Sequence, residues 1–240
     1  EKTVSFELIQ YFSRHDRNNH YFPESVPQTS DVNSLVEADI YLIAVADRAI
    51  QKVASQLSNR SGLVLHTSGS IPMKALSSTK RHGVFYPVQT FSKKGAIDWR
   101  KTPLALEASS QKDMELLRKF ASEISDHIYE IDSKRRKKLH LSAVFANNFS
   151  NHMFTLAQTI CEENQLDFDL LKPLIQETSA KVMSISPEEA QTGPARRLDV
   201  EVLKEQASQL NVEQEKIYTL LSESISKMYN EKENRNSCNQ

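Results

Sequence analysis

Small and polar residues follow three apolar runs of this sequence, at the points where buried strands would end. Continuous apolar runs such as 39–47, 62–66 and 83–86 are typical of parallel strands that are buried on both faces. Ligands bind at the carboxyl ends of such strands, so we expect the loops after the first two runs to contact a cofactor. The same residue types also serve ordinary turns, which is the alternative reading. The expected cofactor-binding residues of these loops are Ala44, Val45, Asp47, Thr67, Ser68 and Gly69.

A hydroxyl and a guanidinium follow an earlier apolar run, 6–12, in the form of Ser13 and Arg14. In dinucleotide-binding sheets the end of the second strand meets the adenosine ribose, and a cation there accommodates a 2′-phosphate. Forked, charge-assisted hydrogen bonds suit a phosphate dianion. The pair therefore favours NADP over NAD, while the alternative is an ordinary solvated arginine at a strand end.

The third constellation lies on a predicted helix, where His140, Asn147 and Asn151 are spaced seven and four residues apart. On a regular α-helix this spacing places them on one face. Asparagine is a poor helix former, and a buried amide without a partner costs about 1–3 kcal/mol. We therefore expect these side chains to line a polar cleft between two domains. The alternative is a structural hydrogen-bond network or a dimer contact.

Two basic segments allow both structural and ligand-binding roles. Arg196 and Arg197 follow the turn-forming Gly193 and would suit a carboxylate or phosphate, whereas Asp199 has the residue type of a helix cap. The run 134–138 consists entirely of lysine and arginine and is most simply the solvated first turn of a helix.

Composition excludes several classes of protein. With 30 Lys+Arg against 31 Asp+Glu the net charge is −1, so nothing in the total indicates a nucleic-acid partner. No apolar run approaches the roughly 20 residues of a membrane span, and the amino terminus lacks the pattern of a secretion signal. Two scattered cysteines fit a reducing compartment, and the seven histidines show no zinc-binding spacing. We expect a cytoplasmic protein with no membrane contact, no disulfide and no metal site.

The apolar patterns predict an α/β domain followed by a helical one. Strands are expected at 6–12, 39–47, 62–66, 83–86, 102–107 and 127–131. Helices are expected at 48–57, 111–124, 138–161, 168–185, 200–210 and 212–228. The predicted domains are an α/β domain at 1–132 and an all-α domain at 133–228, with a polar, frayed tail at 229–240.

Five motifs in this order resemble a bacterial Rossmann-like family whose C-terminal half is a domain of unknown function. The motifs occupy residues 11–14, 66–70, 85–92, 143–152 and 191–199, and the likeness extends from about residue 6 to residue 228. The family is similar to pyrroline-5-carboxylate, ketopantoate and 3-hydroxyisobutyrate reductases and dehydrogenases. The resemblance implies a doubly wound sheet that binds NADP, and a helical domain that contributes to the substrate site and forms a homodimer.

The implied activity is hydride transfer to or from a small C=O or C=N substrate held between the domains. Val144 occupies the position of the catalytic lysine of 3-hydroxyisobutyrate-type dehydrogenases, so that chemistry does not transfer. His140 is the best substitute acid or base, because the ordinary pKa of histidine is about 6.5. Asn147 and Asn151 would polarise the carbonyl or imine. A non-catalytic nucleotide-binding or dimeric scaffold of the same fold is the alternative.

Two further expectations come from what the sequence contains. Members of such families begin with a strand and a glycine-rich turn, but the first glycine here is Gly62. We therefore expect that a strand-turn-helix segment of about 25–30 residues is missing ahead of this sequence. The apolar stripe at Ile217, Leu220, Leu221 and Ile225 would form a dimer contact or pack within the subunit.

Overall fold

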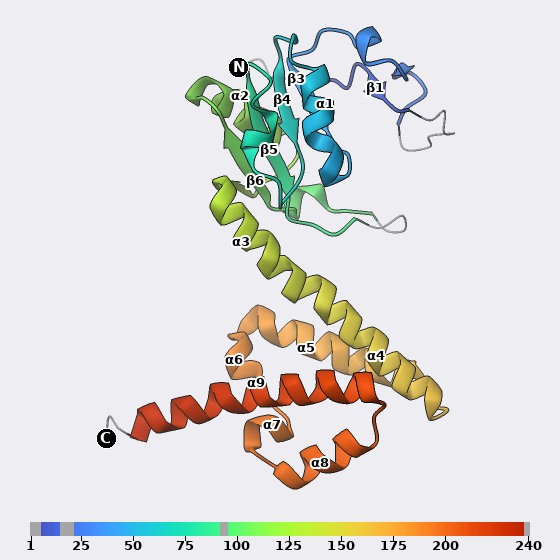
Figure 1. Ribbon diagram of the computed structural model, residues 1–240, viewed down its shortest axis with the longest axis vertical. Coiled ribbons are helices and arrows are strands. Elements are labelled where there is room, and N and C mark those ends of the chain that lie inside the picture. Colours follow the sequence, from blue (N-terminus) through green and yellow to red (C-terminus); the bar gives the residue numbers. More distant parts are fainter. Residues whose placement is uncertain (1–5, 15–21, 92–95, 238–240) are drawn as a thin grey trace. The chain divides into compact units, whose positions relative to one another are not determined.

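The computed structural model describes residues 6–14, 22–91 and 96–237. The chain divides into two compact units, Glu1–Ser150 and Asn151–Gln240. The first unit is a sheet with helices on both faces, and the second is helical (Figure 1). The predicted fold class, a Rossmann-like sheet followed by an all-α region, is confirmed. The expected domain boundary at 132/133 falls at the start of α3, whereas the first compact unit extends to Ser150.

A five-stranded sheet in the order β3-β4-β5-β6-β7 forms the centre of the first unit. All neighbouring strands are parallel except β5 and β6, which are antiparallel. The strands are β3 (Ile40–Ile43), β4 (Leu63–His66), β5 (His82–Pro87), β6 (Leu104–Ala108) and β7 (Ile128–Glu130). Each falls on an apolar run that the sequence predicted as a strand.

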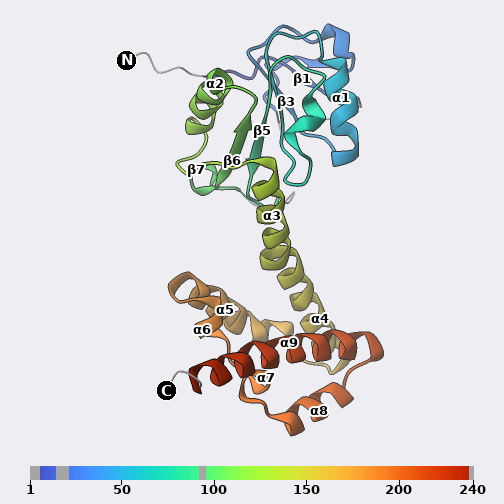
Figure 2. The ribbon, with the colours of Figure 1, turned by 60° about the vertical axis from the view of Figure 1, so that its left-hand side comes forward.

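Helices cover the two faces of this sheet because successive strand residues point to opposite sides. Helix α2 (Gln111–Ser122) packs on the face that carries Leu65 and Phe85. Helix α1 (Ile50–Gln56) and the 3-10 turn Met73–Leu76 cover the other face over Val64. Figures 1 and 2 show α1 and α2 on opposite sides of the sheet. This two-sided burial explains why the strands read as continuous apolar runs rather than alternating ones.

The predicted strand at 6–12 is much shorter and lies elsewhere. Strand β1 (Tyr11–Phe12) pairs in parallel with β2 (Gln28–Thr29) as a separate two-stranded sheet. Before it, the Gln10 side chain accepts a hydrogen bond from the Val36 amide at 2.8 Å and donates one to the Ser34 carbonyl at 3.2 Å. Side-chain bonds to a loop thus replace a strand ladder, so the apolar run alone was misleading.

Helix α3 (Ser133–Ala143) begins five residues earlier than predicted, because Asp132 caps it by accepting a hydrogen bond from the Arg135 amide at 2.8 Å. It continues into a π-helical turn, Val144–Phe149, and then into α4 (Ser150–Glu163). The prediction that the whole 134–138 run is solvated is wrong for one member, since Arg136 is completely buried.

The second unit contains the remaining helices. They are α5 (Lys172–Ser184), α6 (Pro187–Ala190), α7 (Pro194–Arg197), α8 (Val200–Ser208) and α9 (Val212–Ser237). One 3-10 turn of this unit is Phe168–Leu171, and the first unit contains further 3-10 turns at Val32–Ser34, Asp47–Ala49 and Trp99–Lys101. Asp199 caps α8, as its residue type indicated, by accepting from the Val202 amide. The expected frayed tail from 229 onward is corrected, because α9 remains helical to Ser237.

The loop around Gly193 is also structural in character. Gly193 has φ +102°, a conformation that favours glycine. Arg196 donates to the Gln191 carbonyl, and its guanidinium lies 5.1 Å from the centre of the Tyr229 ring. Of the two arginines, Arg196 therefore serves contacts within its own unit.

Candidate functional site

A cavity of about 550 Å³ lies at the carboxyl ends of β3, β4 and β5 in the first unit. Loops after β3 and β4 form one side, and the end of β5 and the middle of α3 form another. The residues that line it are Leu42, Ala44, Asp47, Thr67, Ser68, Gly69, Ser70, Phe85, Tyr86, Pro87, Gln89, Phe91, Trp99 and His140. This is the position at which doubly wound sheets bind ligands, and the volume is ordinary for a small-molecule site.

Six residues predicted from the sequence meet in this one cavity. They are Ala44, Asp47, Thr67, Ser68, Gly69 and His140. The two loops and the helix are far apart in the sequence, and the parallel order of β3 and β4 brings the loops together. Their proposed roles toward a ligand remain predictions.

The chemical centre of the cavity is a pair formed by Tyr86 and His140. The Tyr86 hydroxyl oxygen lies 3.1 Å from His140 Nδ1, within hydrogen-bond distance. Burial raises the pKa of Tyr86 above its usual value, and the nearby positive charge of Arg136 opposes this effect. The phenol therefore keeps its proton at neutral pH and can donate it.

Gly69 makes this pair possible by lying against both rings. A Cβ atom on Gly69 would stand 2.8 Å from His140 Cγ and Nδ1 and 2.8 Å from Tyr86 Cζ. Real Cβ atoms essentially never come that close to other atoms. Glycine at this position therefore reflects the close approach of the two rings.

The loop after β4 combines turn chemistry with free polar atoms. The Ser68 hydroxyl accepts hydrogen bonds from the amides of Ser70 and Ile71, both at 3.1 Å, so it serves the backbone. Among the residues that the structure describes, the Thr67 hydroxyl and the Asp47 carboxylate have no hydrogen-bond partner, and both residues line the cavity. These two groups are available to a ligand.

His66, the last residue of β4, is a buried neighbour of the site that the sequence analysis did not single out. Its Nδ1 accepts a hydrogen bond from the Ser68 amide at 3.1 Å, so its proton lies on Nε2. Burial, and secondly the charge of Arg136, lowers the pKa of His66 to about 4. His66 is consequently neutral at physiological pH and helps to shape the loop.

Several predicted site residues lie outside the cavity lining. Val45 is 42% exposed, and Ser13 and Arg14 follow β1 in the two-stranded sheet. Asn147 is exposed within the π-helical turn, and Asn151 belongs to the second unit. The π-helical turn uses i→i+5 spacing, so the α-helical spacing that aligned Asn147 with His140 does not hold there. The roles of these residues remain predictions.

The sequence did not single out Tyr86, Gln89, Phe91 or Trp99 as site residues, although Gln89 and Phe91 belong to the loop after the third apolar run. The available signal for Tyr86 was a hydroxyl-bearing residue near the carboxyl end of an otherwise apolar strand, directly before Pro87. That signal is weak alone, because tyrosine is also a common strand residue. Its importance becomes visible only when α3 places His140 beside it.

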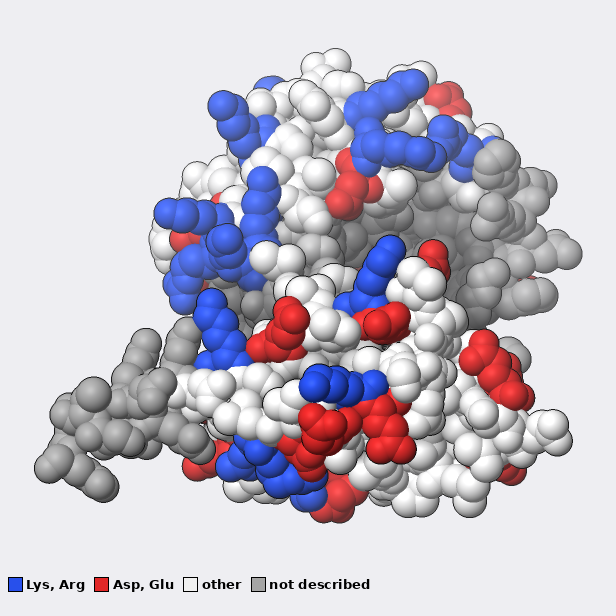
Figure 3. Space-filling view, turned by 60° about the horizontal axis from the view of Figure 1, so that its bottom comes forward, with Lys and Arg blue, Asp and Glu red and all other residues white. Residues whose placement is uncertain are grey.

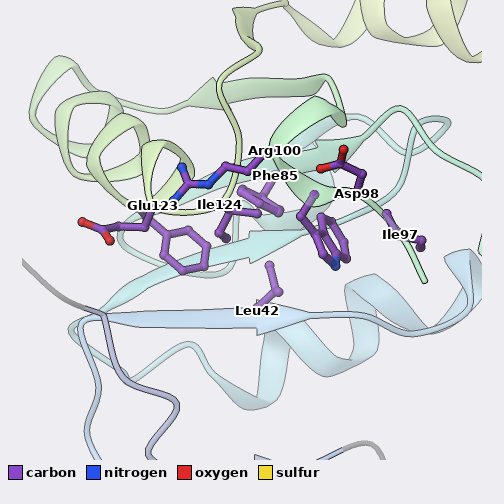
Figure 4. Close-up of a pocket in the computed structure, with 9 residues that line it drawn as sticks. Leu42, Phe85, Ile97, Asp98, Arg100, Glu123 and Ile124 are labelled. Carbon is purple, nitrogen blue, oxygen red and sulfur yellow. The ribbon is translucent and has the colours of Figure 1, made fainter.

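A second cavity of about 630 Å³ opens on the α2 side of the sheet (Figure 4). Leu42, Phe85 and Trp99 line both cavities. In Figure 4 the apolar side chains of Leu42, Phe85 and Ile124 lie between β3 and α2, with Asp98, Arg100 and Glu123 around them. Leu42 is 46% exposed, which shows that α2 does not cover the β3 part of this face.

No helix in the described ranges has both the length and the apolar character that membrane crossing requires.

No match was found among curated proteins. Among solved structures, a protein from Bacteroides fragilis named a "putative NADP oxidoreductase" is 37% identical, with a TM-score of 0.85, and the match covers 92% of this chain and 89% of that one.

More distant structures share the fold. A protein from Thermotoga maritima is 26% identical with a TM-score of 0.66, and the match covers 86% of this chain and 81% of that one. A protein from Mycobacterium avium named a "putative oxidoreductase" is 13% identical with a TM-score of 0.57, and the match covers 84% of this chain and 83% of that one. Residues 102–225 match the model of a domain of unknown function, DUF2520. The chain therefore belongs to the DUF2520 family.

Proposed function

We propose that this protein is an NADP-dependent oxidoreductase that acts on a small C=O or C=N substrate, with the Tyr86–His140 pair moving the proton. The observation that carries the proposal is this hydrogen-bonded pair in a cavity at the strand ends of a Rossmann-like sheet. The name of the Bacteroides fragilis relative, at 37% identity, supports the same class of reaction.

The residues around the cavity fit a dinucleotide. Ala44 is small enough to allow close approach, and Thr67 offers a hydroxyl that has no hydrogen-bond partner in the described part of the chain. The Asp47 carboxylate can accept from ribose hydroxyls, as acids do in dinucleotide sites. Arg14, which follows β1, would hold the 2′-phosphate that distinguishes NADP from NAD.

The bound cofactor supplies or accepts a hydride, and the chain must supply or accept one proton. In reduction, the Tyr86 phenol gives its proton to the substrate oxygen or nitrogen, while the protonated His140 ring donates a hydrogen bond through Nδ1 to the Tyr86 oxygen. His140 then passes a proton to the tyrosine oxygen as the phenol proton leaves. The product is an alcohol or an amine, and the histidine is left neutral until it regains a proton from water.

The final proton donor of this step is the Tyr86 phenol. The raised pKa of Tyr86 keeps the phenol protonated, so it can act as the final donor. The His140 imidazole can return a proton to the phenol, because its Nδ1 lies 3.1 Å from the Tyr86 oxygen. The apolar walls formed by Leu42, Phe85 and Trp99 would limit the access of water to the reacting groups.

A direct test titrates the protein, including any residues that naturally precede this sequence, with NADPH and NADH. We expect NADPH to bind more tightly than NADH. The variants Tyr86→Phe and His140→Ala should retain NADPH affinity but lose turnover on a panel of ketones, keto acids and imines. If neither NADPH nor NADH binds, the cofactor assignment is contradicted. Binding without turnover by the wild-type protein across the panel favours the non-catalytic scaffold instead.

We also propose that the protein forms a homodimer in which the helical unit provides the contact between the two copies. Among its described residues only Cys161, Ala195 and Gln214 are buried. Large apolar side chains such as Leu170, Leu174 and Leu220 are at least 63% exposed, and Figure 3 shows uncharged side chains between charged ones on this unit. An all-α unit of this size needs a larger core, and a second copy would supply one.

Light scattering tests the dimer directly. We expect about twice the mass of one chain, and Leu220→Asp should shift the protein toward monomer because it places a charge in the apolar contact. Lys204→Asp, at an exposed position on α8, is the control for added charge. A wild-type protein of monomeric mass at the concentrations of the activity assay would overturn the dimer proposal.

A further inference from the structure

A completely buried arginine lies one turn before His140 on α3. Arg136 is 0% exposed, and its Nη1 pairs with the carboxylate of Glu107 on β6. Its Nη2 donates to the Ile71 carbonyl at 2.7 Å and approaches the Ser133 hydroxyl at 3.3 Å. A guanidinium presents its donors in a rigid fork, so one side chain holds a strand and a loop at the same time.

Ser133 completes the cluster. Its hydroxyl donates to the Glu107 carboxylate at 2.7 Å and accepts a hydrogen bond from the Met73 amide at 2.9 Å. The first turn of α3, strand β6 and the segment 71–73 are therefore joined by charged and polar contacts. We call Glu107, Ser133 and Arg136 the α3 clamp.

The distance between the two contact points on the sheet matches the distance between Arg136 and His140 along α3. Val84 lies opposite Glu107 in the β5–β6 ladder, and Tyr86 lies two residues farther along the same face of β5. Two strand residues span about 6.6 Å, and the four residues from Arg136 to His140 rise about 6 Å along α3. The helix therefore attaches to one face of the sheet at two points, over Glu107 and over Tyr86.

The clamp also holds the loop that carries the third member of the site. Ile71 and Met73, which it binds, follow Gly69 by two and four residues. Gly69 lies against both the His140 and Tyr86 rings with no room for a Cβ atom. The clamp thus touches the elements that supply Gly69 and His140 and the strand next to the one that supplies Tyr86.

We propose that Arg136 and Glu107 are positioning residues, which hold α3 and the 67–73 loop so that His140 meets Tyr86 at hydrogen-bond distance. The proposal rests on the proposed function only for the use of the pair in proton transfer. The positioning of His140 beside Tyr86 requires no ligand. An ion pair that only stabilised the fold would not set the distance between these two side chains.

A second ion pair, with a buried carboxylate and a partly exposed arginine, provides a control. Arg81 pairs with Asp113 at 2.7 Å, and the Asp113 side chain is 5% exposed. This pair joins the start of α2 to the segment before β5, and neither residue lines the cavity. Glu107→Gln and Asp113→Asn make the same change, from a carboxylate to an amide of nearly equal shape, in the same unit.

The test is an NMR measurement of the His140 imidazole nitrogens in protein labelled with ¹⁵N-histidine and free of nucleotide. In the wild type we expect a single tautomer for His140, in contrast to the exposed His152, which serves as an internal reference. Glu107→Gln and Arg136→Lys should shift His140 toward the tautomer mixture of His152. Asp113→Asn should leave the His140 signal unchanged while lowering the melting temperature.

A double variant protects the test against simple unfolding. Replacing both Glu107 and Arg136 by methionine leaves no unpaired buried charge, so the fold should survive. The ordered His140 signal should nevertheless be lost, since methionine cannot fix the loop and the helix together. An unchanged His140 signal in the folded variants overturns the proposal, as does an equal change in Asp113→Asn. Because no nucleotide is present, the NADPH titration decides the proposed function separately.

Discussion

A methyl group at residue 69 should force apart the two rings of the candidate site. The Cβ of a Gly69→Ala variant would lie 2.8 Å from atoms of both His140 and Tyr86, whereas ordinary van der Waals contact begins near 3.4 Å. Either both rings or the backbone of residue 69 must move by about 0.6 Å, the difference between these distances. If that movement falls along the 3.1 Å contact between Tyr86 and His140, the hydrogen bond is broken.

The energetic cost follows from overpacking. Adding a methyl group to a tightly packed site usually costs about 1–3 kcal/mol, and the loss of one neutral hydrogen bond adds about 1 kcal/mol. We therefore expect Gly69→Ala to lower the free energy of unfolding by about 2–4 kcal/mol in urea denaturation. If Tyr86 and His140 transfer the proton, turnover should fall about 10²-fold or more.

Gly193→Ala is the control for loss of stability without loss of the site. Gly193 has φ +102° and nothing within 4 Å of the added Cβ, so its cost arises from backbone strain of about 1–3 kcal/mol. It lies in the other compact unit. This variant should be destabilised yet keep the His140 NMR signal of the wild type. Gly69→Ala protein that unfolds within about 0.5 kcal/mol of wild type and keeps that signal would refute the packing argument.

Three further outcomes are expected. The pKa of His66 is lowered to about 4 from 6.5, so between these pH values the unfolded chain binds a proton that the folded protein does not bind. The contribution of His66 to the free energy of unfolding should be complete above pH 6.5 and should fall by about 3 kcal/mol as the pH decreases toward 4. In urea titrations at several pH values, His66→Gln should remove this part of the pH dependence. Leu117→Ala, at a fully buried position on α2, should cost about 2–5 kcal/mol, clearly more than the same change at the partly buried Leu116, and equal costs would contradict the assigned core. Arg14→Ala should weaken NADPH binding about tenfold or more and leave NADH binding unchanged, and equal losses for both nucleotides in calorimetry would remove Arg14 from the 2′-phosphate site.

The sheet could be predicted from the sequence because its information is local. Strands β3, β4 and β5 are continuous apolar runs, and each ends in small or polar residues within a few positions. Parallel order then places those ends on one edge without knowledge of any particular contact. The meeting of the loops at 44–47 and 67–69 was therefore foreseeable, and the cavity lining includes most of their residues.

The contacts that define the site could not be predicted, because they join distant positions. Tyr86 and His140 are 54 residues apart, and Arg136 and Glu107 are 29 residues apart. Within the run 134–138 four of the five cations are exposed, so the local pattern correctly indicates a solvated segment for all but Arg136. The burial of that one residue depends on a carboxylate supplied by a different strand.

Asn147 illustrates a different limit. Its predicted alignment with His140 assumed 3.6 residues per turn, but the segment Val144–Phe149 is π-helical. Single π-helical turns inside α-helices cannot be read from hydrophobic periodicity and occur often at functional sites. The helix type, rather than the residue types, was the missing information.

The Tyr86–His140 pair is more than the fold requires, which favours a functional reading. Replacing two hydrogen-bonded partners by apolar groups of similar shape is nearly neutral for stability, so phenylalanine and leucine could fill these positions. The hydrogen-bonded Tyr86–His140 pair is present instead. It is also served by a buried ion pair, a kind of contact that apolar residues often replace without loss of stability. Two separate features, the polar pair and the buried ion pair, thus give up possible stability to hold one phenol against one imidazole in a cavity, as expected when the arrangement is kept for chemistry.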